Sequence, residues 1–283
     1  MKLDAFHSVC KRAKAQRGVV IVGVCNVTPD SYSDGGEFLH VEQAQKRVDV
    51  LIQEGADIVE IGADSSRPGS EEVSASVQLE RLAHVVRYAV SKIAVSIDTM
   101  HPNVADFCLR EGALAVNDVS CLARPALADV VVQHHACLML VHARGSQADM
   151  KGFSQYEESA YGDIVREVLE EWESAAKVAQ GRGLRRDALV MDPGFGFAKS
   201  AQHSMTLLKR LDRLTSCLDV PVLIGASRKS FLTLVDEGAT PRERLGASLA
   251  AAWIGIQKGA ALVRVHDVRD TKQAIDLMGL MRE

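Results

Sequence analysis

The sequence predicts an α/β protein with the fold of a single (β/α)8 barrel of the TIM type. Eight short runs rich in β-branched residues alternate with amphipathic helical patterns along the chain. The 283 residues suit one such barrel, which typically needs about 250. The longest segments without periodicity, residues 28–40, 63–75 and 144–159, each follow a predicted strand. A barrel carries its functional loops at these positions.

The predicted elements follow one another in strict alternation. The strands are expected at residues 19–25, 58–61, 93–97, 114–116, 137–141, 189–191, 222–224 and 261–265. The helices are expected at residues 41–53, 77–90, 103–111, 126–134, 161–180, 204–217, 242–258 and 272–281. Gly55, Gly112 and Gly259 precede strands and are typical of left-handed helix caps. We expect one domain over residues 1–283, in which residues 1–17 form an N-terminal extension.

Charge and composition exclude several classes of protein. Thirty-three basic and 37 acidic residues give a net charge of -4, which does not favour a nucleic-acid or anionic membrane partner. No apolar stretch reaches the ~18 residues of a membrane span, and no signal peptide is evident at the N-terminus. The six cysteines lack metal-ligand spacing and are expected to be reduced. These features predict a cytoplasmic protein.

Polar residues mark the ends of the predicted strands. Because these ends converge on one rim of a barrel, we expect the side chains to meet in one pocket. They are, in chain order, Asn26, Asp64, Asp98, Asn117 with Asp118, His142, Asp192, Ser227 with Arg228 and Lys229, and Arg264 with His266.

Each of these residues also has a structural interpretation. Asp and Asn after a strand often form turns or cap the next helix, and Asp118 is interpreted mainly in this way. Arg228 and Lys229 could begin a solvated helix. Basic charge in a first helical turn opposes the helix dipole, however, and so indicates an anionic or hydrogen-bonding partner.

The types of these side chains suggest a ligand. Two carboxylates, an Asn and a Lys can satisfy the donors and acceptors of a flat nitrogen heterocycle, on whose face Arg264 could stack. The groups that suit a phosphate are Asn26, Ser66, Arg67 and His266. A metal site formed by Asp98, His142 and Asp192 cannot be distinguished from hydrogen-bonding groups by sequence. HExxH, Walker A, GxGxxG and GxSxG motifs are absent.

Seven motifs together resemble the dihydropteroate synthase family. They extend from near residue 18 to the C-terminus, which is nearly the whole chain. They are NVTPDSYSDGG at 26–36, SSRPG at 65–69, SIDT at 96–99, NDVS at 117–120, DPGFGF at 192–197, SRKSF at 227–231 and RVHDV at 264–268. The resemblance implies a (β/α)8 barrel, a homodimer, and condensation of 6-hydroxymethyl-7,8-dihydropterin diphosphate with 4-aminobenzoate to 7,8-dihydropteroate and pyrophosphate.

The resemblance also implies roles for individual residues. The pterin would be held by Asp98, Asn117, Asp192 and Lys229, with Arg264 stacked on its ring. Mg2+ on the diphosphate would be bound with help from Asn26, and the diphosphate oxygens would contact Ser66, Arg67, Arg264 and His266. The aminobenzoate would be framed by Pro68, Phe197, Lys229, Ser230 and residues 28–36. The groups expected to act in catalysis are Arg67, Asp98, Asp192, Lys229 and His266.

Three short segments depart from the motifs common in the family. The family commonly has Gly-Gly-Glu-Ser-Thr at residues 62–66, where this chain has GADSS, and Met-His-Met at 141–143, where it has VHA. It commonly has Gly-Phe-Gly-Lys-Thr at residues 196–200, where this chain has GFAKS, and none of these departures removes a proposed catalytic group. Ala143 and Asp64 are expected to alter the fine shape of the pockets. Two alternatives remain, a corrinoid methyltransferase acting on methyltetrahydrofolate and a non-catalytic pterin- or phosphate-binding relative. Neither would be expected to release pyrophosphate from the two substrates.

Overall fold

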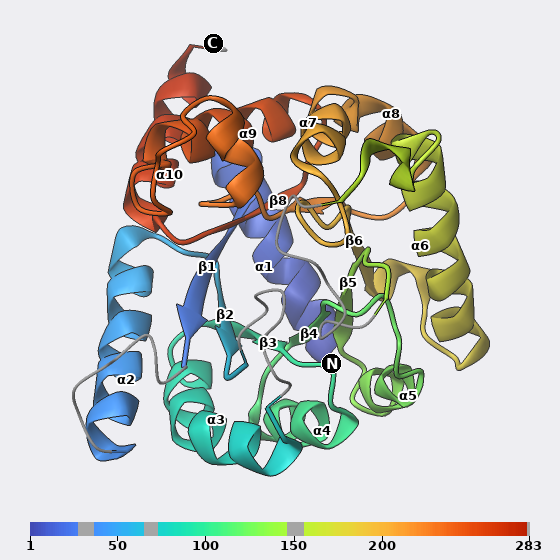
Figure 1. Ribbon diagram of the computed structural model, residues 1–283. Helices are drawn as coiled ribbons and strands as arrows, with labels where there is room; N and C mark the ends of the chain where they lie inside the picture. Colours follow the sequence, from blue (N-terminus) through green and yellow to red (C-terminus); the bar gives the residue numbers. More distant parts are fainter. Residues whose placement is uncertain (28–36, 65–72, 146–155, 282–283) are drawn as a thin grey trace.

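The computed structural model describes residues 1–27, 37–64, 73–145 and 156–281, which form the predicted barrel (Figure 1). Eight parallel strands pair in the order β6-β5-β4-β3-β2-β1-β8-β7. A bridge between Met191 and Val222 joins the two outermost strands, so the ring is nearly closed. The strands are β1 (Val20–Asn26), β2 (Ile58–Gly62), β3 (Ala94–Asp98), β4 (Ala115–Asp118), β5 (Cys137–Val141), β6 (Leu189–Asp192), β7 (Leu223–Ile224) and β8 (Leu262–Val265).

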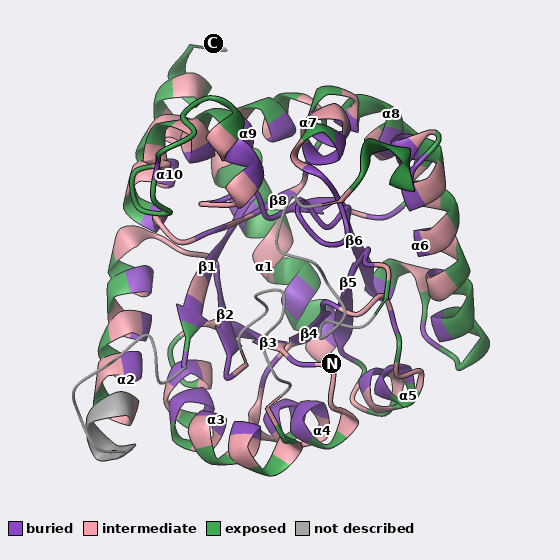
Figure 2. Ribbon diagram, in the orientation of Figure 1, coloured by how far each residue is buried: buried purple, intermediate pink, exposed green. Residues whose placement is uncertain are grey.

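Helices surround the strands and cover the outside of the ring (Figures 1 and 2). Their buried faces pack on strands rich in Val, Ile and Leu, as expected for a parallel sheet that is covered on its outer side. The α-helices of the described residues are α1 (Lys2–Arg17), α2 (Glu37–Glu54), α3 (Ala75–Val90), α4 (Pro102–Glu111), α5 (Ala126–Gln133), α6 (Ile164–Gly181), α7 (Ala201–Lys209), α8 (Leu211–Cys217), α9 (Leu245–Gln257) and α10 (Val268–Leu280). Short 3-10 turns lie at η2 (Glu158–Ala160), η3 (Arg186–Ala188) and η4 (Ser230–Leu234). None of these helices is long and apolar enough to cross a membrane.

Most predicted elements are confirmed, and several boundaries shift. Strands β1, β3, β4 and β6 continue through their terminal polar residue because its backbone still pairs with the neighbouring strand, as Asp98 does with Gly62 and Asn117. The single helix predicted at 204–217 is wrong: α7 ends before Arg210 and α8 begins after it. Gly55, Gly112 and Gly259 have positive φ, as predicted for left-handed caps.

Helix α1 was not among the predicted helices. Its first turn is joined to the segment before β5 by a bond from the Leu3 N–H to the His135 carbonyl, 2.8 Å long. At its other end, Arg17 donates two hydrogen bonds to Asp57, of 2.8 and 2.7 Å, and Asp57 also accepts one from the Ile21 N–H. These contacts place α1 across the amino ends of the strands, where Figure 1 shows it through the middle of the ring. The barrel is therefore covered at the end opposite the polar strand termini.

Candidate active site

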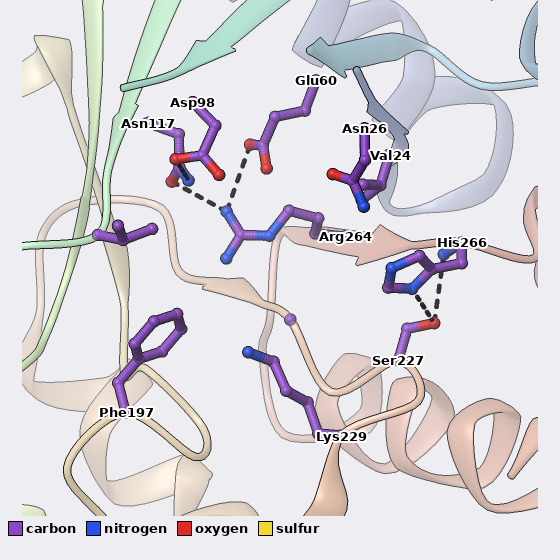
Figure 3. Close-up of a pocket in the computed structure, with 12 residues that line it drawn as sticks. Val24, Asn26, Glu60, Asp98, Asn117, Phe197, Ser227, Lys229, Arg264 and His266 are labelled. Atoms are coloured by element: carbon purple, nitrogen blue, oxygen red, sulfur yellow. Dashed lines mark hydrogen bonds and ion pairs between the residues drawn. The ribbon is translucent and has the colours of Figure 1, made fainter. Parts of the chain in front are cut away.

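A pocket opens at the carboxyl ends of the strands and gathers most of the predicted side chains (Figure 3). Seven of the twelve lining residues had been predicted to bind substrate, and they come from β1, β3, β4, β8 and the segments after β6, β7 and β8. The lining residues are Val24, Asn26, Glu60, Asp98, Asn117, Val119, Phe197, Gly225, Ser227, Lys229, Arg264 and His266. The convergence expected from the strand ends is thus present.

Arg264 lies at the centre of this pocket and is bonded to several acceptors at once. Its Nη1 donates to the Asn117 Oδ1 at 2.9 Å and to the Glu60 Oε2 at 3.3 Å. Its Nη2 donates to the Asp192 Oδ2 at 2.5 Å. The guanidinium is therefore bonded to Asn117 and Asp192, two residues that were expected to hold the pterin. The sequence analysis had instead placed Arg264 on the face of the pterin ring.

Three carboxylates lie near the guanidinium, and burial raises the pKa of two of them, Asp98 and Glu60. Asp98 accepts a hydrogen bond from the Asn117 Nδ2 at 3.3 Å. Burial, followed by the nearby Glu60 carboxylate, raises the pKa of Asp98 to about 7. Burial also raises the pKa of Glu60, against the opposing effect of Arg264. Asp192 does not itself line the pocket, but one of its oxygens accepts from Arg264 and the other from the Gly194 N–H at 2.7 Å.

Lys229 and Phe197 face each other across the pocket (Figure 3). The Lys229 Nζ lies 4.2 Å from the centre of the Phe197 ring, a distance that permits a cation–π contact. Burial, followed by repulsion from Arg264, lowers the pKa of Lys229 to about 8. Ser230, the next residue, begins η4 and is half-buried.

His266 and Asn26 occupy another side of the pocket. The His266 Nδ1 lies 3.1 Å from the Ser227 hydroxyl, and burial followed by Arg228 lowers the pKa of His266 to about 4. The imidazole is therefore neutral at pH 7 and can contact an anion only as a hydrogen-bond donor. Asn26 is exposed at the end of β1.

An apolar wall completes the pocket. Val119 and Phe197 line the pocket and belong to a small hydrophobic cluster that also contains Val141 and Ala143. Three of these four residues have short side chains, so this wall consists of small apolar groups and one ring. Such a surface can cover the face of a flat ligand.

Several predicted residues lie elsewhere. His142 has no exposed surface and does not line the pocket; its ring bonds to Glu171 and Lys199. Arg228 pairs with Asp267 at the start of α10, so its partner is a side chain of this protein. Asp118 accepts hydrogen bonds from the N–H groups of Ser120 and Leu122, which confirms its interpretation as a turn residue.

Two further sets of predicted residues are not part of the pocket. Asp64 accepts a hydrogen bond from the Val73 N–H at 3.2 Å and does not line the pocket. Ser66, Arg67, Pro68 and residues 28–36 lie outside the described residues.

Glu60 is the charged pocket residue that the sequence analysis missed. It lies in the middle of β2 rather than at its end, between Val59 and Ile61, and only 4% of its surface is exposed. A charged residue within a buried apolar run was the available signal, because such a residue is almost never fully buried unless it is paired.

The pocket offers few ligands for a metal ion. Among the described residues, no group of three or more His, Cys, Asp or Glu side chains is arranged to hold one. Asn26 offers a single amide oxygen at the pocket edge. This fits Mg2+, which keeps water ligands and takes others from substrate phosphates, only if the ion arrives with a diphosphate.

Comparison with known proteins agrees with this arrangement. A family model described as pterin binding enzyme matches residues 22–266. A dihydropteroate synthase of Synechocystis sp. is 37% identical over 256 residues, which cover 89% of this chain and 86% of the relative.

Solved structures show the same likeness. Xanthomonas albilineans dihydropteroate synthase with 4-aminobenzoic acid is 35% identical, with a TM-score of 0.85 over 93% of both chains. The same enzyme in complex with 7,8-dihydropteroate is 33% identical, with a TM-score of 0.81 over 93% of this chain and 94% of that chain. By its sequence and its barrel, the chain belongs to the dihydropteroate synthase family of pterin-binding enzymes.

Proposed function

We propose that this pocket condenses 6-hydroxymethyl-7,8-dihydropterin diphosphate with 4-aminobenzoate, the dihydropteroate synthase reaction. The activity is that of a transferase in folate biosynthesis. The observation that carries the assignment to this pocket is the meeting of Asp98, Asn117, Lys229 and Arg264 at the carboxyl ends of four different strands or loops. This set supplies acceptors and donors in one buried place, as the edge of a pterin requires.

The pterin binds where Arg264 now lies. Asp98 and Asp192 accept the ring and exocyclic N–H groups, while Asn117 and Lys229 contact the remaining polar atoms. Arg264 must then exchange its bonds to Asn117 and Asp192 for a place beside the ring. The acceptors are occupied in the free protein, so the buried charges are paired before substrate arrives.

The reaction forms a C–N bond and breaks a C–O bond. As the C–O bond weakens, positive charge develops on the pterin methylene and spreads into the ring, where the carboxylates Asp98 and Asp192 stabilise it. The neutral aromatic amine attacks this carbon and afterwards loses a proton, and pyrophosphate leaves. No covalent enzyme intermediate or strong base is required, so the pocket contributes mainly position and electrostatics.

The diphosphate lies on the side of Asn26 and His266. Neutral His266 donates a hydrogen bond to it, and Asn26 contributes an oxygen ligand to Mg2+. When bound, the metal ion neutralises charge on the leaving pyrophosphate. Ser66 and Arg67 are proposed to reach the same oxygens from the loop after β2.

The aminobenzoate lies on the side of Phe197 and Lys229. The Phe197 ring packs against the benzoate ring, and Ser230 with the Lys229 ammonium meets the carboxylate. Pro68 and residues 28–36 are proposed to complete this side. Lys229 would therefore touch both substrates, which suits its position opposite the Phe197 ring.

We also propose that the enzyme is a homodimer formed through α9. This helix contains no charged residue, and its inner face is already buried on the barrel through Ala251 and Gly255. Its outer face is still apolar, with Trp253 half-buried and 39% of Ile254 exposed. A surface helix that is apolar on all sides is typical of a buried environment.

The test of this function is product formation from the two purified substrates with Mg2+. We expect one pyrophosphate and one 7,8-dihydropteroate per turnover, measured by coupled absorbance and by chromatography. A methyltransferase would release no pyrophosphate but would transfer a methyl group from methyltetrahydrofolate. A non-catalytic relative would bind the pterin and form neither product. Either result would contradict the proposal.

A further inference from the structure

A hydrogen-bonded network of four side chains begins beside the Phe197 segment and ends at the surface of α6. Lys199, in the segment between β6 and α7, places its Nζ 2.8 Å from the Nδ1 of His142. The Nε2 of His142 lies 3.0 Å from Glu171 on α6, and Arg144 donates to the same carboxylate. Lys199 and His142 have no exposed surface, and neither lines the pocket.

The hydrogen bonds indicate which nitrogen of His142 carries the proton. In its protonated form Lys199 can only donate, and in that state the Nδ1 of His142 accepts while its Nε2 donates to Glu171. Burial, followed by the Lys199 charge, lowers the pKa of His142 to about 4, which agrees with a neutral ring. Hydrogen bonds from His142 and Arg144 lower the pKa of Glu171 to about 2, so this carboxylate stays ionised.

Burying the charged amine of Lys199 at this position costs free energy of folding. Among the described residues no carboxylate lies within ion-pair distance of it, and burial lowers the pKa of its amine to about 7. Its remaining hydrogen bonds go to backbone carbonyls, at 2.9 Å to that of Phe197 and at 3.4 Å to that of His142. A methionine of similar length would fill the same space without the cost of burying a charge.

Lys199 donates to the carbonyl of Phe197, whose ring is part of the apolar wall of the pocket. The segment from 194 to 198 has an unusual backbone, because Gly194, Gly196 and Ala198 all have positive φ. Ala198 adopts φ 48°, a conformation that costs a residue with a Cβ about 1 kcal/mol or more. Two hydrogen bonds hold the backbone around this strained residue. The Lys199 ammonium donates to the Phe197 carbonyl, and the Tyr161 hydroxyl donates to the Ala198 carbonyl at 3.2 Å.

We propose that Lys199 is a positioning residue that, aimed by His142 and Glu171, fixes the Phe197 backbone and so sets affinity for the aminobenzoate. This proposal rests on the proposed function, because it assigns the Phe197 side of the pocket to that substrate. Lys199 touches neither substrate. Its effect reaches the pocket through the Phe197 ring, which faces Lys229.

The test is the Lys199→Met variant, assayed with each substrate varied separately. We expect KM for 4-aminobenzoate to rise about tenfold, the factor for losing one hydrogen bond from a charged donor, while KM for the pterin diphosphate stays within about twofold. The temperature of unfolding should change little, because the variant removes a buried charge but also leaves the buried acceptors of His142 and Phe197 without their donor. Lower stability with equal losses for both substrates would show a merely structural role and overturn the proposal.

Two further variants make the result decisive. Asp57→Asn weakens the contacts of α1 at the opposite end of the barrel and should lower stability while leaving both KM values unchanged. If Lys199→Met does not fold, His142→Leu replaces it; an unchanged aminobenzoate KM in that variant would contradict the proposal. A wild-type enzyme that forms no dihydropteroate would instead contradict the proposed function, whatever the variants do.

Discussion

The bonds of Arg264 explain how three carboxylates can share one buried pocket. Glu60 and Asp192 each accept from the guanidinium, and Asp98 is linked to it through Asn117. A buried carboxylate that loses such a partner is strongly destabilised, so the free pocket depends on this pairing. Substrate binding must replace the bonds that Arg264 gives up, and the pterin N–H groups can do so.

The first prediction concerns Asp192. In Asp192→Asn an amide NH2 replaces one of the two carboxylate oxygens, one of which accepts from Arg264. An amide also cannot accept two ring protons or stabilise a cationic methylene. We expect a folded protein whose kcat/KM is about 100-fold lower, on the order of 2 to 3 kcal/mol, measured by pyrophosphate release. The same result is expected for Asp98→Asn.

The control is Asp118→Asn, which changes a buried carboxylate on β4, the strand next to that of Asp98. Within the described part of the chain, Asp118 bonds only to its own turn, so this variant should lose stability but keep its substrate KM values. Wild-type turnover by folded Asp192→Asn would show that this carboxylate does not bind the pterin.

The pH dependence follows from Asp98 and Lys229. Asp98 must be ionised to accept from the ring, so kcat/KM for the pterin should fall as pH drops through about 7. Lys229 must be protonated to donate, so the same quantity should fall as pH rises through about 8. A rate profile between about pH 5.5 and 9.5 should therefore be bell-shaped with a narrow maximum.

Lys229→Arg provides the matched variant for the alkaline limb. A guanidinium keeps its charge throughout this range, so whatever activity remains should no longer fall above pH 8. A profile that is flat from pH 6 to 9 in the wild type would contradict the assignment of both groups.

Which side chains enter the pocket could be predicted only in part. Asp98, Asn117, Lys229 and His266 were found because they end strands of a recognisable barrel. Glu60 was missed because it lies in mid-strand. His142 was wrongly expected at the rim because a sequence does not show whether the first residue after a strand faces the axis or the surrounding helices.

Among the elements, the segment between β6 and α7 contains both the strained residue Ala198 and the pocket residue Phe197. The family commonly has glycine where this chain has Ala198, and the positive φ explains that preference. We expect Ala198→Gly to raise the free energy of unfolding by up to about 1 kcal/mol, measured by urea denaturation.

Ala175→Gly is the comparison for this prediction. Ala175 lies inside helix α6, where glycine costs flexibility without relieving strain, so the variant should be less stable by about 1 kcal/mol. Equal destabilisation by both glycine substitutions would show that Ala198 is not strained.

Elements with strong periodicity were predicted closely, and those without it were not. β5 was predicted at its observed bounds because it is an unbroken apolar run. Helix α1 was missed because its sequence is rich in charge and has only three buried residues, Leu3, Phe6 and Ala13. The break at Arg210 was missed because the apolar spacing continues from α7 into α8.

At the scale of the whole molecule, the apolar face of α9 predicts self-association. We expect the wild type to sediment as a dimer and Ile254→Lys to sediment as a monomer, because a charge in an apolar interface is left without a partner. Val178→Lys, an exposed valine on α6, is the control and should remain a dimer. A wild type that stays monomeric at all accessible concentrations would contradict this interface.

We expect the pterin to bind at the carboxyl ends of the strands by displacing Arg264. A crystal structure of the protein with a bound pterin would show this placement. We predict the ring within hydrogen-bond distance of Asp98, Asn117 and Asp192, with Arg264 released from Asn117 and Asp192. A pterin bound elsewhere, with Arg264 still bonded to both residues, would contradict the account.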